Sequence, residues 1–101
     1  MTPPRQLDVS HDALALICKR YRVLELAVFG SVARGQAGPK SDLDLLVLFE
    51  NDARVTLFTL IELQSELSHL FGRPVDLVPK NGLKSALRPE VLAEAQVLYA
   101  A

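Results

Sequence analysis

The chain has 101 residues, of which 50% are hydrophobic and 23% charged, a composition that excludes a disordered tail and favours a packed globular domain. Its 11 Lys and Arg against 12 Asp and Glu give a formal net charge of −1, which argues against indiscriminate binding to a nucleic-acid backbone. A single cysteine, the lack of an apolar signal segment and the lack of any apolar run near ~20 residues predict one cytoplasmic domain over residues 1–101, without disulfide or membrane span.

The first half of the chain predicts a helix and two strands, with a glycine-rich turn between the strands. Apolar residues recur at helical spacing over 10–22, where Ser10 can cap the N-terminus of the helix. Residues 24–29 are apolar with β-branched and aromatic members, so they predict a buried strand that ends at a glycine. A short helical turn is expected at 31–34. Residues 42–49 then predict a second strand, whose alternate residues share a face.

The second half predicts two helices and two short strands. Residues 55–71 place leucines along one stripe and are followed by Gly72, a residue type that commonly ends helices. A third strand is expected over 75–78, between prolines. A last helix is expected over 89–96, where it opens with proline, and 97–99 can add a final strand. This order of elements predicts an α+β fold with a small mixed β-sheet and helices packed on it.

Three aspartates interrupt strands that are otherwise apolar. Asp42 and Asp44 are two residues apart, so both carboxylates emerge on the same face of a strand, with Cα atoms ~7 Å apart. Carboxylates at that separation can converge on hard cations such as Mg²⁺, whereas two buried acids without a cation repel each other. If the strand that carries Asp76 is a neighbour, three acids meet in an arrangement suited to displacement at phosphorus by two metal ions. The alternative interpretation is that Asp42 and Asp44 cap the preceding turn at the mouth of a strand and that Asp76 is an acid in water at a strand edge.

A Gly-Ser turn follows the first predicted strand. Gly30 allows a phosphate to approach the backbone, and the free N–H groups of the following helical turn can accept an anion. The hydroxyl of Ser31 can add a donor, and Arg34 can meet a phosphate or a carboxylate in the same cleft. Because glycine and serine are common in loops, this turn indicates a phosphate site only in combination with the acids.

The combined pattern is Gly-Ser-x₁₀-Asp-x-Asp, running from Gly30 to Asp44. It resembles the signature of the DNA polymerase β-like nucleotidyltransferase superfamily and is most similar to the minimal nucleotidyltransferases, over nearly the whole chain. The resemblance implies the polymerase β-like fold, with ATP as substrate. It also implies that the three acids are catalytic and hold two Mg²⁺ ions, Asp76 completing the site. The Gly-Ser turn, here Gly30 and Ser31, would hold the triphosphate, with Arg34 as a further phosphate-binding candidate.

The same resemblance implies transfer of AMP from ATP to a hydroxyl, with release of pyrophosphate. Stand-alone minimal nucleotidyltransferases are typically encoded beside a HEPN-domain protein and act as its antitoxin. The expected acceptor is therefore a tyrosine of a HEPN ribonuclease toxin, with which the chain would form a hetero-oligomer. Neither a membrane nor a long nucleic acid is expected as a partner.

Three alternatives stay open at this point: an antitoxin that inhibits by binding alone, a small-molecule nucleotidyltransferase, and a structural subunit. The intact trio of acids favours an enzyme over an antitoxin that acts by binding alone. The short chain leaves little room for a second domain that would bind a small-molecule acceptor.

Overall fold

The computed structural model describes residues 9–36, 38, 41–82 and 88–101. The strands in this part of the chain are β1 (Val23–Phe29), β2 (Leu43–Phe49), β3 (Val75–Pro79) and β4 (Gln96–Ala100). They form one four-stranded sheet in the order β3-β2-β1-β4, in which β2 and β3 run parallel while β1 is antiparallel to β2 and to β4. The predicted α+β fold with a small mixed sheet is confirmed.

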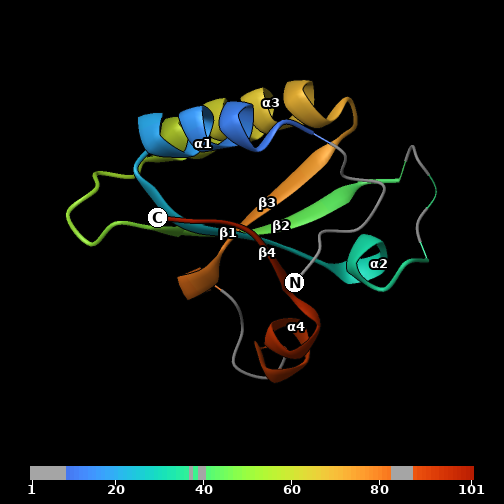
Figure 1. Ribbon diagram of the computed structural model, residues 1–101. Coiled ribbons are helices and arrows are strands. Elements are labelled where there is room, and N and C mark those ends of the chain that lie inside the picture. The colour runs from blue at the N-terminus through green and yellow to red at the C-terminus, as the bar shows by residue number, and fades with distance from the viewer. Residues whose placement is uncertain (1–8, 37, 39–40, 83–87) are drawn as a thin grey trace.

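Two longer helices, α1 (His11–Arg20) and α3 (Leu57–Phe71), lie side by side along one side of the sheet (Figure 1). The side chain of Ser10 accepts a hydrogen bond from the Ala13 amide, which confirms the predicted cap of α1. Two short helices, α2 (Gly30–Ala33) and α4 (Arg88–Glu94), pack on each other away from α1 and α3. A short 3₁₀ helix (Lys80–Gly82) follows β3.

The hydrophobic core lies between the sheet and the pair α1 and α3. Alternate residues of β2 point into it, as the sequence pattern predicts, and the leucine stripe of α3 covers them from above. The fully buried members from these two elements are Leu43, Leu45, Val47, Leu63 and Leu67. Cys18 of α1 also lies in the core, where burial raises the pKa of its thiol to about 12. The thiol therefore stays protonated at neutral pH and packs as an apolar group.

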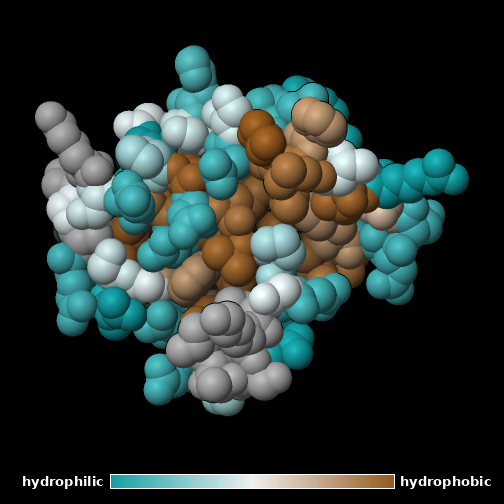
Figure 2. Space-filling view, turned by 180° about the vertical axis from the view of Figure 1, so that it is seen from behind, coloured by the Kyte–Doolittle hydropathy of each residue, from teal (hydrophilic) through white to brown (hydrophobic). Residues whose placement is uncertain are grey.

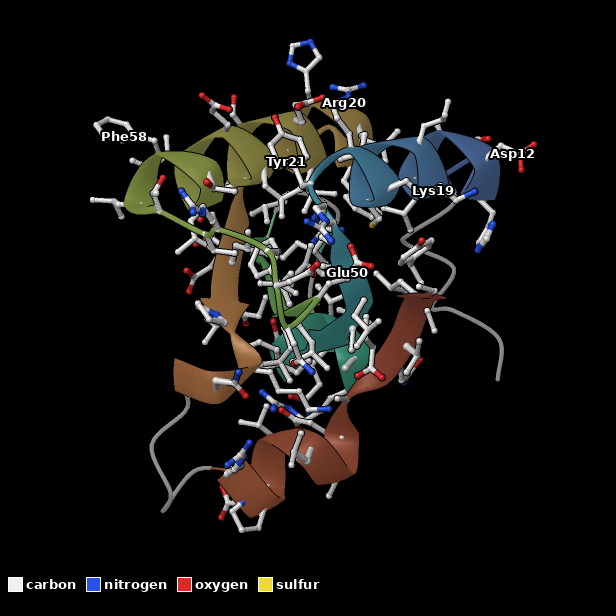
Figure 3. The ribbon with its side chains drawn as sticks, turned by 90° about the vertical axis from the view of Figure 1, so that its left-hand side faces the viewer. Asp12, Lys19, Arg20, Tyr21, Glu50 and Phe58 are labelled. Atoms are coloured by element: carbon white, nitrogen blue, oxygen red, sulfur yellow. The ribbon has the colours of Figure 1, made fainter. Side chains whose placement is uncertain are left out.

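The end of α1 is tied to α3 by polar contacts. The guanidinium of Arg20 donates to Glu66 at 2.6 Å, and the hydroxyl of Tyr21 donates to the other carboxylate oxygen of Glu66. Figure 3 shows Arg20 and Tyr21 together beside α3. Helix α1 ends at Arg20, before the predicted limit at residue 22, because Arg22 adopts a φ of 59° that turns the chain into β1.

The two outer strands of the sheet, β3 and β4, make different contacts. Strand β4 pairs with β1 over residues 96–100, so the final strand predicted over 97–99 belongs to this sheet. Because Gln96 is already part of β4, α4 ends at Glu94, ahead of the predicted limit at residue 96. At the opposite edge, the side-chain oxygen of Gln64 in α3 accepts a hydrogen bond from the Leu77 amide of β3 at 3.1 Å.

An exposed apolar patch surrounds the start of α3 and consists of Val55, Leu57, Phe58 and Ile61. Phe58 is 75% exposed, and Figure 3 shows it pointing away from the first turn of α3. Figure 2 shows apolar residues gathered over the face seen from behind. Part of the high hydrophobic content therefore lies on the surface. Among the residues described, no helix has the length and apolarity needed to cross a bilayer.

Candidate active site

The three predicted acids lie at one end of the sheet, where β2 and β3 begin next to each other. In the parallel register Asp44 pairs with Asp76, so their side chains leave the same face of strands about 4.8 Å apart. Asp42 directly precedes β2. Asp42 and Asp76 are exposed, whereas Asp44 is half-buried. Strands β2 and β3 are thus neighbours. The sequence predicted that the three acids would lie together if these two strands were adjacent.

The electrostatics of Asp44 favour a bound cation. Burial raises the pKa of the Asp44 carboxyl, and the negative charges of Asp76 and Asp42 raise this pKa further, with Arg34 opposing them. A cation near these acids would offset their repulsion. Mg²⁺ is commonly held by one or two carboxylates together with substrate phosphates and water, and the oxygen donors present here fit that ion. In the described part of the chain, no three His, Cys, Asp or Glu side chains form a ready-made metal cage.

The Gly-Ser turn lies beside Asp44. Gly30 begins α2 with a φ of 75°, immediately after Phe29, which pairs with Asp44 across the sheet. A Cβ atom at Gly30 would lie 2.3 Å from Oδ2 of Asp44, closer than Cβ atoms come to non-bonded heavy atoms in proteins. The absence of a side chain at Gly30 therefore allows the Asp44 carboxylate to pack against the backbone of the turn. Ser31 follows as the second residue of α2 and is partly exposed.

A fourth carboxylate, for which the sequence carries no motif, binds the Gly-Ser turn at this end of the sheet. Oε1 of Glu94, the last residue of α4, accepts a hydrogen bond from the Gly30 amide at 3.0 Å, and Oε2 accepts one from Nη1 of Arg34 at 2.9 Å. Burial works to raise the pKa of Glu94, but the hydrogen bonds from Arg34 and Gly30 outweigh it and the pKa is lowered. Of the two partners expected for Arg34, the structure shows the carboxylate.

Comparison with known proteins identifies the family. Residues 12–99 match the family model described as "Nucleotidyltransferase domain". The chain belongs to this family. This nucleotidyltransferase is 46% identical, over 76 residues that make up 75% of each chain, to the protein adenylyltransferase MntA of Thermococcus cleftensis. It is also 44% identical to a structure assigned as a minimal nucleotidyltransferase, with a TM-score of 0.71 over 85% of this chain and 86% of that one.

Two toxin–antitoxin structures share the fold at lower sequence identity. One is a toxin–antitoxin with AMP-PNP, with a TM-score of 0.73 and 20% identity over 92% of this chain and 75% of that one. The other is a tri-AMPylated Shewanella oneidensis HEPN toxin with its MNT antitoxin, with a TM-score of 0.64 and 18% identity over 90% and 70% of the two chains. At these identities the likeness shows the nucleotidyltransferase fold. The predicted family and enzyme class are confirmed.

A buried arginine of this nucleotidyltransferase holds the segment that leads into the first acid. Arg73 follows α3 and is only 6% exposed. Its Nε donates to the carbonyl oxygen of Ser41 and its Nη2 to that of Gly38, each at 2.9 Å. Because Arg73 lies just before β3 while its side chain reaches the residues before β2, it links the segments that carry Asp76 and Asp42. It is therefore a positioning residue for the candidate site.

Replacing Arg73 with alanine is expected to lower the free energy of unfolding by about 2–4 kcal/mol, because two carbonyl groups lose hydrogen bonds from a charged donor. Arg73→Lys should fall between wild type and Arg73→Ala, since an ammonium group cannot reproduce the fork of donors. The exposed Arg54 provides a matched control, whose replacement by alanine should change stability by less than ~0.5 kcal/mol. Urea unfolding followed by circular dichroism measures all three. An Arg73→Ala variant as stable as Arg54→Ala would contradict the role assigned to Arg73.

Proposed function

We propose that this nucleotidyltransferase is a protein adenylyltransferase that transfers AMP from ATP to a hydroxyl of a partner protein. The observation that carries the proposal is the close approach of Gly30 to Asp44, which places the turn proposed to bind phosphate beside the acids proposed to bind metal. The similarity to MntA, a protein adenylyltransferase of which this chain covers 75%, supports the class of acceptor.

The proposed acceptor is a tyrosine hydroxyl of a HEPN-domain ribonuclease toxin, which the chain neutralises as an antitoxin within a hetero-oligomer in the cytoplasm. Support comes from the shared fold with the MNT antitoxin found in complex with a tri-AMPylated HEPN toxin. An AMP group on tyrosine adds bulk and negative charge, and both oppose the binding of an RNA phosphate.

Each residue of the site has a proposed role in this reaction. Asp42, Asp44 and Asp76 would hold two Mg²⁺ ions, which supply positive charge where negative charge develops on the phosphates. The Gly30 amide, the Ser31 hydroxyl and the Arg34 guanidinium would bind the triphosphate.

The bond changes in this reaction balance without a further reactant. The acceptor oxygen forms a bond to the α-phosphorus of ATP, and the bond from that phosphorus to the bridging oxygen breaks, so pyrophosphate leaves. The proton of the hydroxyl passes to a base. Asp76, exposed at the start of β3, is our candidate for the group that orients this hydroxyl or accepts its proton.

The proposal is tested by incubating the chain with a HEPN-domain protein from the same source, ATP and Mg²⁺, and weighing the intact HEPN protein by mass spectrometry. The expected result is a gain of one or more AMP units, which disappears with EDTA and with the double variant Asp42→Ala/Asp44→Ala. Asp12→Ala, which removes an exposed acid in the first turn of α1, should leave the transfer unchanged. A partner that is inhibited without a change in mass would instead indicate an antitoxin that acts by binding alone.

A further inference from the structure

Two of the three donors assigned above to the triphosphate, the Gly30 amide and the Arg34 guanidinium, already have an anionic partner within this chain. Glu94 accepts hydrogen bonds from the Gly30 amide at 3.0 Å and from Nη1 of Arg34 at 2.9 Å, one on each carboxylate oxygen. Carboxylate and phosphate oxygens are acceptors of the same kind and prefer the same distances to such donors. Both cannot occupy the same N–H groups at once, so Glu94 and a triphosphate compete.

We propose that Glu94 is an internal competitor of the nucleotide phosphates, which binds Gly30 and Arg34 in the nucleotide-free chain and leaves them when a triphosphate binds. The inference rests on the proposed function, because that function assigns these two donors to the triphosphate. It adds a residue that sets nucleotide affinity without contacting the acceptor hydroxyl.

The surroundings of Glu94 favour its departure once another anion bridges the donors. Its negative charge is one of those that raise the pKa of Asp44, so the carboxylates of Glu94 and Asp44 repel each other. The Glu94 side chain is 26% exposed, and that of Arg34 is 47% exposed, so both groups have access to water. A released carboxylate would therefore regain hydration and move away from the neighbouring acids.

The position of Glu94 in the chain limits how much must move. Helix α4 buries none of its residues fully, so a shift of this helix loses little apolar contact. The next element is fixed more firmly, because Gln96 pairs with Val28 in the sheet and its side chain donates to the Ala33 carbonyl at 3.1 Å. Release of Glu94 therefore involves α4 and the side chain itself, while β4 keeps its place.

The test measures the binding of Mg²⁺ and α,β-methylene ATP, which cannot transfer its AMP, by isothermal titration calorimetry. Glu94→Ala is expected to lower the dissociation constant about tenfold, because the nucleotide no longer has to displace a charged acceptor. Glu94→Gln should lower it less, since the amide oxygen can still accept from the Gly30 amide. Glu90→Ala, which removes an exposed acid from the first turn of the same helix, is the matched control and should bind as the wild type does.

Each outcome of this titration has a defined meaning. Equal binding by Glu94→Ala and Glu94→Gln, with both variants folded by thermal melting, would overturn the proposal. Weaker binding would also overturn it and would assign Glu94 to holding Arg34 in place for the nucleotide. Tighter binding without AMP transfer to any partner would support Glu94 as a competitor while removing the proposed function. AMP transfer by the wild type, together with a dissociation constant that does not change in Glu94→Ala, would support the proposed function and would remove Glu94 as a competitor. Failure of every variant to bind would overturn both.

Discussion

Replacing Gly30 with alanine is expected to abolish nucleotidyl transfer and to lower the free energy of unfolding by about 2–3 kcal/mol. The added Cβ would lie 2.3 Å from Oδ2 of Asp44, so either the carboxylate or the turn must move. The φ of 75° adds a separate cost of about 1–2 kcal/mol for any residue with a side chain. A shift of the carboxylate or of the turn would separate the proposed phosphate-binding residues from the acids. The proposed chemistry requires these two groups to lie close together.

Two other glycines isolate the contact with Asp44 from the backbone cost. Gly35 and Gly72 have φ angles of 73° and 67°, and an added Cβ at either would meet nothing within 4 Å. Alanine at these positions should therefore cost about 1–2 kcal/mol, the backbone contribution alone. Urea unfolding and the AMP-transfer assay compare the three variants. If Gly30→Ala lost no more stability or activity than Gly35→Ala, the contact between Gly30 and Asp44 would have no role.

Asp44→Asn is expected to raise the melting temperature in EDTA at pH 7 by roughly 4 °C, which corresponds to about 1 kcal/mol in a domain of this size, and to abolish transfer. Burial and the charges of Asp76 and Asp42 raise the pKa of Asp44 in the folded chain. A carboxyl whose pKa is raised by folding stabilises the fold at low pH, and this contribution is lost as the pH rises through the folded-state pKa. At neutral pH the ionised Asp44 therefore destabilises the metal-free fold, and the neutral asparagine removes that effect.

The pH and Mg²⁺ dependence of melting provides the control. As the pH falls through the folded-state pKa of Asp44, the wild-type carboxyl is protonated and the difference between wild type and Asp44→Asn should shrink. Mg²⁺ at neutral pH should raise the melting temperature of the wild type more than that of Asp44→Asn, because the variant lacks a ligand. Differential scanning fluorimetry across pH, with EDTA or Mg²⁺, measures both effects. An Asp44→Asn variant that melts below the wild type in EDTA would show that Asp44 has a structural role.

The features predicted well from the sequence depend on local patterns. Alternation of apolar residues placed the strand over 42–49 and its buried face, and the leucine stripe placed the helix over 55–71. Whether the strand that carries Asp76 lies beside the strand that carries Asp44 was left open by the sequence, and the structure pairs the two strands in parallel. Local periodicity placed each acid on its strand, whereas the pairing of the strands is a tertiary feature.

The features that the sequence did not reveal depend on contacts between distant parts of the chain. Glu94 is 64 residues from Gly30 and belongs to a short helix with no distinctive motif, so its contact with the turn had no local signal. Arg73 is 35 residues from Gly38, and its position next to a glycine and a proline is equally typical of a surface loop. The early end of α1 depends on the φ of 59° at Arg22, a conformation that arginine seldom adopts.

The hydrogen bond from the Leu77 amide to Gln64 bears on how this protein behaves at high concentration. Leu77 lies in β3, the outer strand of the sheet, and an outer strand offers its free amides as a template for a strand from another molecule. The Gln64 side chain already accepts the hydrogen bond from the Leu77 amide. A strand from another molecule could pair with this amide only by displacing Gln64. The Gln64 side chain thus opposes edge-to-edge pairing at this position of β3, while at the opposite side of the sheet β4 pairs with β1 and is itself the outer strand.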